Sequence, residues 1–191
     1  FLTAFFAIQE GMKHRLTGSK RMKNRPLKIL VTALRDLGAN IDYEEKEGYP
    51  PLIITGKKLS ENTLEINGNV SSQYLTALLL IAPKLKEGLR LNLIGKVTSR
   101  PYLEMTIALL KKLDIKVAWK EQSICVQFKA TIKPVHLTVE SDWSSASYFY
   151  SLAALSKKAS ISLSSFKKGS LQGDSALVSI YKNFGVETTF N

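Results

Sequence analysis

The alternation of hydrophobic and polar positions predicts a chain in which helices and strands follow one another. Apolar residues recur at helical spacing in some segments and at every second position in others. Helices are predicted at 1–9, 26–37, 72–83, 101–113, 144–157 and 174–184. Strands are predicted at 40–46, 51–56, 63–67, 90–95, 115–120, 123–128, 135–140, 159–163 and 186–190. This order indicates an α/β or α+β fold rather than a helical array.

One motif recurs wherever an apolar helix ends and a strand begins, at 37–43, 113–119 and 184–190. The first residues of these segments lie 76 and 71 positions apart. A serine-containing pattern at 71–78 returns 73 positions later at 144–151, and the same shift backwards aligns 74–79 with 1–6. The chain is therefore predicted to repeat a β-α-β-α-β-β unit of about seventy residues.

The helices of such units are expected to pack inside small mixed sheets and to meet in a common interior. The segment 72–83 is apolar almost all round, so we expect that helix to be buried almost all round. The segment 129–134 interrupts the periodic pattern and ends at Pro134, which suggests a boundary between the second and third units. The repeat also suggests that the chain begins within a helix at Phe1 and stops within a unit at Asn191.

Charge narrows the choice of partner without deciding it. The 191 residues include 27 Lys and Arg against 16 Asp and Glu, a net charge of +11, with a dense basic run from Lys13 to Lys28. A basic surface attracts nucleic acid or small multiply charged anions. Aromatic residues interleaved with exposed basic ones would favour nucleic acid. Here the aromatic residues fall mostly at apolar-periodic positions, so nucleic acid, small anions and a merely basic surface all remain open.

Several other classes of function find little support in the sequence. No apolar run is long enough to span a bilayer, and Phe1 to Ile8 is interpreted as part of a helix rather than a signal peptide. The single cysteine, Cys125, fits a reducing, cytoplasmic compartment, and its strand pattern predicts a small buried side chain. His14 and His136 are far apart in sequence, so we expect no metal site.

A candidate anion site follows the strand predicted at 63–67. Ser71, Ser72 and Gln73 begin the next helix, where free backbone N–H groups and the positive end of the helix dipole favour a negatively charged ligand. Two hydroxyls and an amide at that position could hold a phosphate and a second polar group. The simpler alternative is that the serines only cap the helix.

Arginine precedes proline at the start of two other helices, as Arg25-Pro26 and Arg100-Pro101. The guanidinium fork suits phosphate and carboxylate, although a solvated surface arginine is the plain alternative. The third counterpart, at 170–174, has lost the Arg-Pro pair and gained Asp174. A carboxylate there could cap its helix or accept the proton of a substrate hydroxyl.

Taken together, these motifs resemble the EPSP synthase family, the 3-phosphoshikimate 1-carboxyvinyltransferases. The matching segments follow the family's order and spacing, at 16–26, 49–52, 71–79, 99–104, 142–149 and 171–174. The resemblance implies an enolpyruvyl transferase-like fold of two domains, each with three copies of the repeated unit and a substrate cleft between them. Residues 1–138 would be most of the inserted domain, and residues 139–191 would begin the second domain.

The implied reaction transfers the enolpyruvyl group of phosphoenolpyruvate to the 5-hydroxyl of shikimate 3-phosphate and releases phosphate. By this resemblance, Ser71, Ser72 and Ser99 would bind shikimate 3-phosphate, chiefly its phosphate. Gln73 would contact both substrates, and Tyr102 would line the shikimate side.

The other two implied roles concern phosphoenolpyruvate and proton transfer. Arg25 would bind phosphoenolpyruvate, while Asp174 would hold the attacking hydroxyl and accept its proton. The role of Arg100 stays open. The resemblance implies no metal or organic cofactor, no nucleic acid or membrane partner, and a parent enzyme that is a monomer.

The family's N-terminal Lys-Ser site and its Gly-Asn-Ala-Gly-Thr turn would precede Phe1, and its later Lys-Glu and Arg clusters would follow Asn191. We therefore expect this polypeptide alone not to turn over. The related family that acts on UDP-N-acetylglucosamine uses a reactive loop cysteine, and Cys125, in a strand pattern, is not a candidate for that role.

Overall fold

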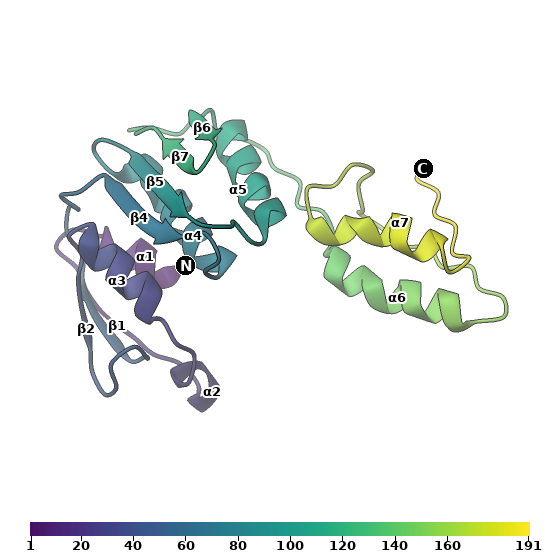
Figure 1. The fold of residues 1–191 in the computed structure, drawn as a ribbon, viewed down its shortest axis with the longest axis horizontal. Coiled ribbons are helices and arrows are strands. Elements are labelled where there is room, and N and C mark those ends of the chain that lie inside the picture. The colour runs from purple at the N-terminus through teal and green to yellow at the C-terminus, as the bar shows by residue number, and fades with distance from the viewer. The chain divides into compact units, whose positions relative to one another are not determined.

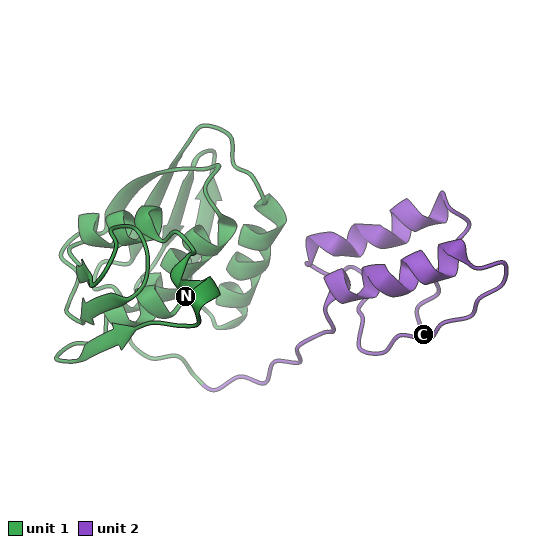
Figure 2. Ribbon diagram, turned by 90° about the horizontal axis from the view of Figure 1, so that it is seen from below, with its two compact units in different colours: residues 1–133 green, residues 134–191 purple.

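The computed structural model describes residues 1–191, which form two compact units, Phe1–Lys133 and Pro134–Asn191 (Figure 2). The division falls directly before Pro134, in the segment whose composition suggested a boundary. The correspondence of residues 1–138 and 139–191 to the two domains of the family stays a prediction.

The first half of unit 1 builds a small antiparallel sheet with helices against it. Strands β1 (Lys13–Leu16), β2 (Asn40–Tyr43) and β3 (Leu52–Thr55) form a sheet in the order β1-β3-β2. The helices are α1 (Leu2–Ala7), α2 (Lys20–Lys23) and α3 (Lys28–Asp36). Helix α1 packs against α3, β3 and the helix α4 of the next repeat (Figure 1).

The second half of unit 1 is a complete copy of the predicted β-α-β-α-β-β unit. Its elements are β4 (Thr63–Asn67), α4 (Ser72–Ile81), the 3₁₀ turn η1 (Ala82–Lys84), β5 (Leu89–Ile94), α5 (Arg100–Lys112), β6 (Val117–Lys120) and β7 (Ser123–Val126). The sheet has the order β4-β5-β7-β6, with β4 parallel to β5 and the other pairs antiparallel. The prediction of a small mixed sheet is confirmed.

Helix α4 forms the centre of the unit 1 core. Leu75, Leu78 and Leu79 are completely buried, and α1 and α5 both pack against the helix. The expectation of burial all round holds for most of the helix, but Leu80 is 48% exposed and Gln73 in the first turn is exposed too. Because other helices pack against α4 on more than one side, most of its surface beyond the first turn is buried, which explains its predominantly apolar sequence.

Two short elements were not predicted, and both lie in the basic run. In β1, Lys13 and Arg15 are exposed and His14 and Leu16 are half-buried, so only two residues carry the strand's hydrophobic pattern. His14 stacks on Phe6 with ring centroids 4.2 Å apart. Helix α2 has only four residues, and Ser19 caps it by accepting a hydrogen bond from the Met22 N–H at 3.4 Å. Elements this short carry too little periodicity to be recognised.

The predicted burial of Cys125 is wrong. Ile124 and Val126 face the core, so the strand's alternation turns Cys125 to the other side of β7, where it is half-buried. No helix of the chain combines the length and the apolar character needed to cross a membrane.

Unit 2 consists of helices and irregular segments. Its helices are α6 (Trp143–Leu155) and α7 (Leu177–Lys182), joined to the 3₁₀ turn η2 (Gly173–Ala176). Trp143, Ala146 and Tyr150 on one side of α6 form its core, with Phe166 and Tyr181 packed against them. The Trp143 and Phe166 rings meet edge to face at 5.0 Å.

The strands predicted at 135–140, 159–163 and 186–190 are not formed. Residues in or just after the first two segments make the contacts seen here: the Ser141 N–H donates to the Ser165 carbonyl at 2.8 Å, and Lys167 donates to the Thr138 carbonyl at 3.2 Å. In unit 1 the parallel pair β4–β5 is continued by the antiparallel β7. An isolated pair of strands is only marginally stable. The extended segments of unit 2 are not part of a sheet, and Val139 in the first of them is 88% exposed.

Candidate functional site

The carboxyl ends of β4 and β5 meet at one edge of the second sheet of unit 1. Because the two strands are parallel, the turns that follow them and the N-termini of α4 and α5 come to the same edge. The Gly68 N–H donates to the Ile94 carbonyl at 2.8 Å, and the Thr98 N–H donates to the Gly68 carbonyl at 3.1 Å. These two bonds join the turn that carries Ser71 to the turn that carries Ser99.

Gly68 allows this close approach because it has no side chain. A Cβ atom there would lie 3.1 Å from the Val97 Cγ2 and 3.2 Å from the Lys96 carbonyl oxygen. These neighbouring atoms would then have to move by a few tenths of an ångström. The glycine therefore allows the turns that carry Ser71 and Ser99 to lie next to each other.

Ser71 occupies the N-cap position of α4, but its hydroxyl makes no capping hydrogen bond. Ser72 and Gln73 follow in the first turn, where backbone N–H groups have no partner within the helix. Ser71 is exposed and Ser72 half-buried. The alternative that Ser71 only caps the helix is therefore not supported.

Ser99 repeats this arrangement at the start of α5. It is the N-cap residue, its side chain makes no capping bond, and its φ of 54° lies in the left-handed region. For a residue other than glycine such a backbone costs about 1–3 kcal/mol and tends to occur at functional sites. Tyr102 donates its N–H to the Ser99 carbonyl at 3.1 Å, and its side chain is 42% exposed.

Arg100 is engaged within the protein. Its Nε donates to Glu104 at 2.8 Å, and its guanidinium lies over the Trp119 ring at 4.4 Å. Both contacts are on the exposed surface, where they contribute roughly 1 kcal/mol or less each. These contacts favour the alternative that Arg100 is a surface arginine over a role in binding substrate.

Arg25 lies in a turn that is tied to α4. Its side chain is exposed, and its N–H donates to the Met22 carbonyl at 3.1 Å. The next residue, Pro26, offers its carbonyl to the Tyr74 hydroxyl, which donates from the first turn of α4. Tyr74 directly follows Gln73, so this contact brings the Arg25 turn beside the Ser71–Ser72–Gln73 turn.

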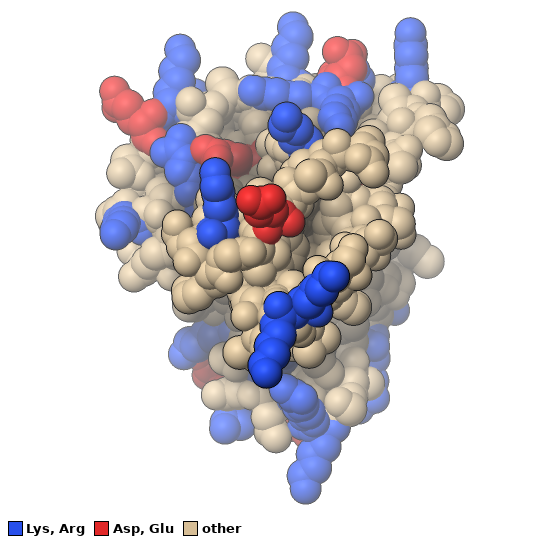
Figure 3. Space-filling view, turned by 90° about the vertical axis from the view of Figure 1, so that its right-hand side faces the viewer, with Lys and Arg blue, Asp and Glu red and all other residues tan.

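Three of the seven Lys and Arg residues in the basic run are paired with one acidic stretch. Arg15 bonds Glu44 at 2.8 Å, Lys23 bonds Glu45 at 2.8 Å, and Lys28 bonds Glu47 at 3.0 Å. Arg25 is not among the ion-paired residues. Lys and Arg side chains are scattered over the face drawn in Figure 3, where they clearly outnumber carboxylates.

Asp174 belongs to unit 2 and is not among the residues that unit 1 brings together. Its carboxylate accepts a hydrogen bond from the Ser144 hydroxyl, so it links η2 to the first turn of α6. Asp142 is the N-cap of α6 and accepts from the Ser144 N–H at 2.9 Å and the Ser145 hydroxyl at 2.9 Å. These hydrogen bonds, that of Ser145 first, lower the pKa of Asp142 below its usual range.

Gln172 organises the same end of α6, a role that the sequence did not reveal. Its Oε1 accepts from the Trp143 N–H at 3.0 Å, and its Nε2 donates to the Ser141 carbonyl at 2.9 Å and to Glu140 at 3.1 Å. Ser170 also donates to Glu140. The only signal in the sequence is the position of Gln172 beside Asp174 in the motif at 171–174.

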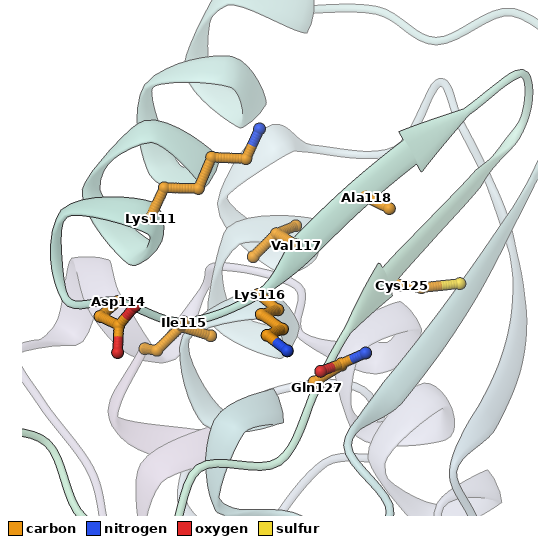
Figure 4. A pocket seen from close by; sticks show the side chains of 8 residues that line it. All are labelled: Lys111, Asp114, Ile115, Lys116, Val117, Ala118, Cys125 and Gln127. Carbon is orange, nitrogen blue, oxygen red and sulfur yellow. The ribbon is translucent and has the colours of Figure 1, made fainter.

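Two surface hollows of unit 1 lie away from these residues. One, of about 370 Å³, is formed by the end of α5 and by β6 and β7, and includes Cys125 (Figure 4). The other, of about 400 Å³, lies beside the C-terminal end of α4 and has Lys57, Lys58, Lys84 and Lys86 at its edge. Neither includes a predicted site residue.

Solved structures identify the class of fold. Two structures of EPSP synthase from Acinetobacter baumannii match it with TM-scores of 0.65 and 0.66. They are 23% identical and cover 80% and 83% of this chain, which covers 33% and 34% of theirs. The fold is that of the enolpyruvyl transferases.

Sequence comparisons then give the family. All of residues 1–191 match the family described as EPSP synthase (3-phosphoshikimate 1-carboxyvinyltransferase), and the chain belongs to it. The 3-phosphoshikimate 1-carboxyvinyltransferase of Bacteroides fragilis strain YCH46 is 46% identical over 194 residues, covering 100% of this chain. That of Actinobacillus pleuropneumoniae serotype 5b is 40% identical over 177 residues, covering 92%. The chain spans 46% and 40% of the lengths of these two relatives.

Proposed function

We propose that this chain is part of a 3-phosphoshikimate 1-carboxyvinyltransferase. The parent enzyme would join the 5-hydroxyl oxygen of shikimate 3-phosphate to the enol carbon of phosphoenolpyruvate and release phosphate. The observation that carries the proposal is the junction of two helix-start turns, at Ser71 and Ser99, whose hydroxyls make no capping bond. Similarity to enzymes with this name supports the choice of substrates.

The geometry suits a phosphorylated sugar-like acid. The hydroxyls of Ser71, Ser72 and Ser99, with the N–H groups at two helix starts, offer donors to one phosphate group. Gln73 directly precedes Tyr74, whose hydroxyl contacts the turn of Arg25, which supports a contact of Gln73 with both substrates. Tyr102, partly exposed in the first turn of α5, would lie against the shikimate ring.

Arg25 would bind the phosphoenolpyruvate. Its exposed guanidinium has no carboxylate partner, and its turn is the one that the Tyr74 hydroxyl joins to the start of α4. A forked donor matches either the phosphate or the carboxylate of that substrate. Both substrates are anions, so a net charge of +11 would also raise their concentration near the surface.

Asp174 is proposed as the group that holds the attacking hydroxyl and accepts its proton. Its contact with Ser144 supports a structural role equally well, because that bond connects η2 with α6. A monomeric parent enzyme and a cytoplasmic location belong to the same proposal. No step of the proposed reaction requires a metal or an organic cofactor.

Binding of shikimate 3-phosphate to this chain, followed by calorimetry or NMR, tests the proposal. We expect Ser71→Ala and Ser99→Ala each to weaken binding roughly tenfold, since a hydrogen bond to a charged group contributes about 1.5–3 kcal/mol. Ser60→Ala is the matched control, because Ser60 precedes β4 and Ser71 follows it. Equal affinity in all four proteins would refute the proposed site. Binding of oligonucleotides with no response to shikimate 3-phosphate would favour a nucleic-acid-binding module instead.

A further inference from the structure

The turn at Arg25 and Pro26 is held from three directions. On its N-terminal side the Arg25 N–H donates to the Met22 carbonyl at 3.1 Å. On its C-terminal side the Leu27 N–H donates to the Gly48 carbonyl at 2.7 Å, which connects the turn to the loop between β2 and β3. The third contact is the Tyr74 hydroxyl, which donates to the Pro26 carbonyl across 48 residues of sequence.

Only the contact from Tyr74 reaches the turn of Ser71, Ser72 and Gln73. The Tyr74 ring is half-buried and packs against the core of unit 1, so the direction of its hydroxyl is set by the same packing that holds α4. A carbonyl can only accept a hydrogen bond, so the contact requires the protonated phenol. Burial raises the pKa of Tyr74, which keeps the phenol protonated at neutral pH.

The residues equivalent to Tyr74 in the other copies of the repeat lack its phenol group. A shift of 73 residues in either direction places Phe1 and Ser147 at the position of Tyr74. Neither carries a phenol, and Ser147 bonds within its own helix, to the Ser144 carbonyl at 2.6 Å. The contact with Pro26 therefore depends on a phenol that only this copy of the repeat carries.

We propose that Tyr74 is a positioning residue for Arg25. Its hydroxyl ties the Arg25 turn to the start of α4 and so sets the spacing between the arginine and the serine turn. The inference rests on the proposed function, in which these groups bind phosphoenolpyruvate and shikimate 3-phosphate, respectively. Tyr74 itself need not touch either substrate.

The test is NMR titration of the chain with phosphoenolpyruvate and, separately, with shikimate 3-phosphate. Tyr74→Phe removes the hydroxyl and keeps the ring. We expect it to weaken phosphoenolpyruvate binding about fivefold, the effect of one lost hydrogen bond, and to change shikimate 3-phosphate binding less than about twofold. In the Arg25→Ala background the same substitution should have no effect on phosphoenolpyruvate binding, because the group that Tyr74 positions is gone. Tyr43→Phe, which removes the hydroxyl of another half-buried tyrosine of unit 1, is the control.

Three results would overturn the inference. If Arg25→Ala weakens phosphoenolpyruvate binding and Tyr74→Phe does not, Tyr74 has no positioning role, although the proposed function stands. If Tyr74→Phe weakens both ligands equally, its effect is a general loosening of unit 1. If Arg25→Ala and Ser71→Ala both leave binding unchanged, the proposed function fails, and the inference fails with it.

Discussion

Helices α4 and α6 are counterparts in the repeat, yet one is enclosed and the other is largely open. Leu75, Leu79 and Ala82 are completely buried in unit 1. Shifted by 73 residues, the same positions in unit 2 are Tyr148, Leu152 and Leu155, which are 73%, 58% and 86% exposed.

Neighbouring elements explain the difference between the two helices. Helix α4 lies against both α1 and α5, whereas α6 packs against η2 and α7. The buried side of α6 is therefore the one that carries Trp143, Ala146 and Tyr150. A repeated sequence can specify a helix and the turn before it, but burial depends on what packs against the helix.

The largest effect is expected in the small core of unit 2. Trp143→Ala should lower the free energy of unfolding of unit 2 by about 4 kcal/mol, because it removes the largest buried side chain and its contact with Phe166. Trp119→Ala in unit 1 should cost less, about 1–2 kcal/mol, since that ring is only half-buried at the edge of the core, with Arg100 over it. Urea titration followed by the amide signals of each unit measures both. Equal losses would mean that unit 2 is not held by this core.

The comparison between α4 and α6 is tested directly by truncating matching leucines. Leu79→Ala should destabilise unit 1 by about 3 kcal/mol, because it leaves a cavity in a closed core. Leu152→Ala, the counterpart in unit 2, should change stability by less than about 0.5 kcal/mol. The measurement is the same urea titration. A large loss from Leu152→Ala would show that the open side of α6 is covered in solution.

The smallest effect concerns the residues at the two helix starts. Asp142→Ala should destabilise unit 2, since the carboxylate caps α6. Ser71→Ala should change the stability of unit 1 by less than about 0.5 kcal/mol, because the Ser71 hydroxyl makes no capping bond. A stability loss from Ser71→Ala as large as that from Asp142→Ala would return Ser71 to a purely structural role.

Lower pH should weaken the capping of α6 by Asp142 and so reduce the stability of unit 2. The pKa of Asp142 is lowered in the folded chain, so its contribution is complete above the usual aspartate value and is lost as the pH falls through the lowered pKa. Asp142→Asn keeps a capping side chain but cannot ionise. Thermal unfolding at several acidic pH values should therefore show a smaller acid-induced loss of unit 2 stability in Asp142→Asn than in the unaltered chain.

Prediction from sequence worked best where the signal is local and repeated. The helix at 101–113 was found as Arg100–Lys112, and the strand at 63–67 has the predicted bounds, because each carries its own periodicity. The three strands predicted in unit 2 had similar patterns and did not form. A strand is stable only when a neighbouring strand satisfies its backbone, and its own residues do not reveal whether that neighbour is present.

The residues of the candidate site also differ in how far the sequence reveals them. Ser71, Ser72, Gln73 and Ser99 could be identified from sequence, since their positions at helix starts follow from the pattern around them. The engagement of Arg100 by Trp119 could not, because it joins a helix to the strand that follows it across the surface. The same holds for the network that Gln172 makes with residues about thirty positions away.

By itself, the amino-acid sequence determined the repeated unit, the helix starts that carry the polar groups, and membership of the EPSP synthase family. Each depends on short runs of residues whose chemistry is visible wherever they occur. The tertiary structure decided which of those starts meet: parallel β4 and β5 bring the Ser71 and Ser99 turns to one edge, Gly68 lets them touch, and Tyr74 brings in Arg25. These contacts join residues distant in sequence, and only packing of the whole unit brings such residues together.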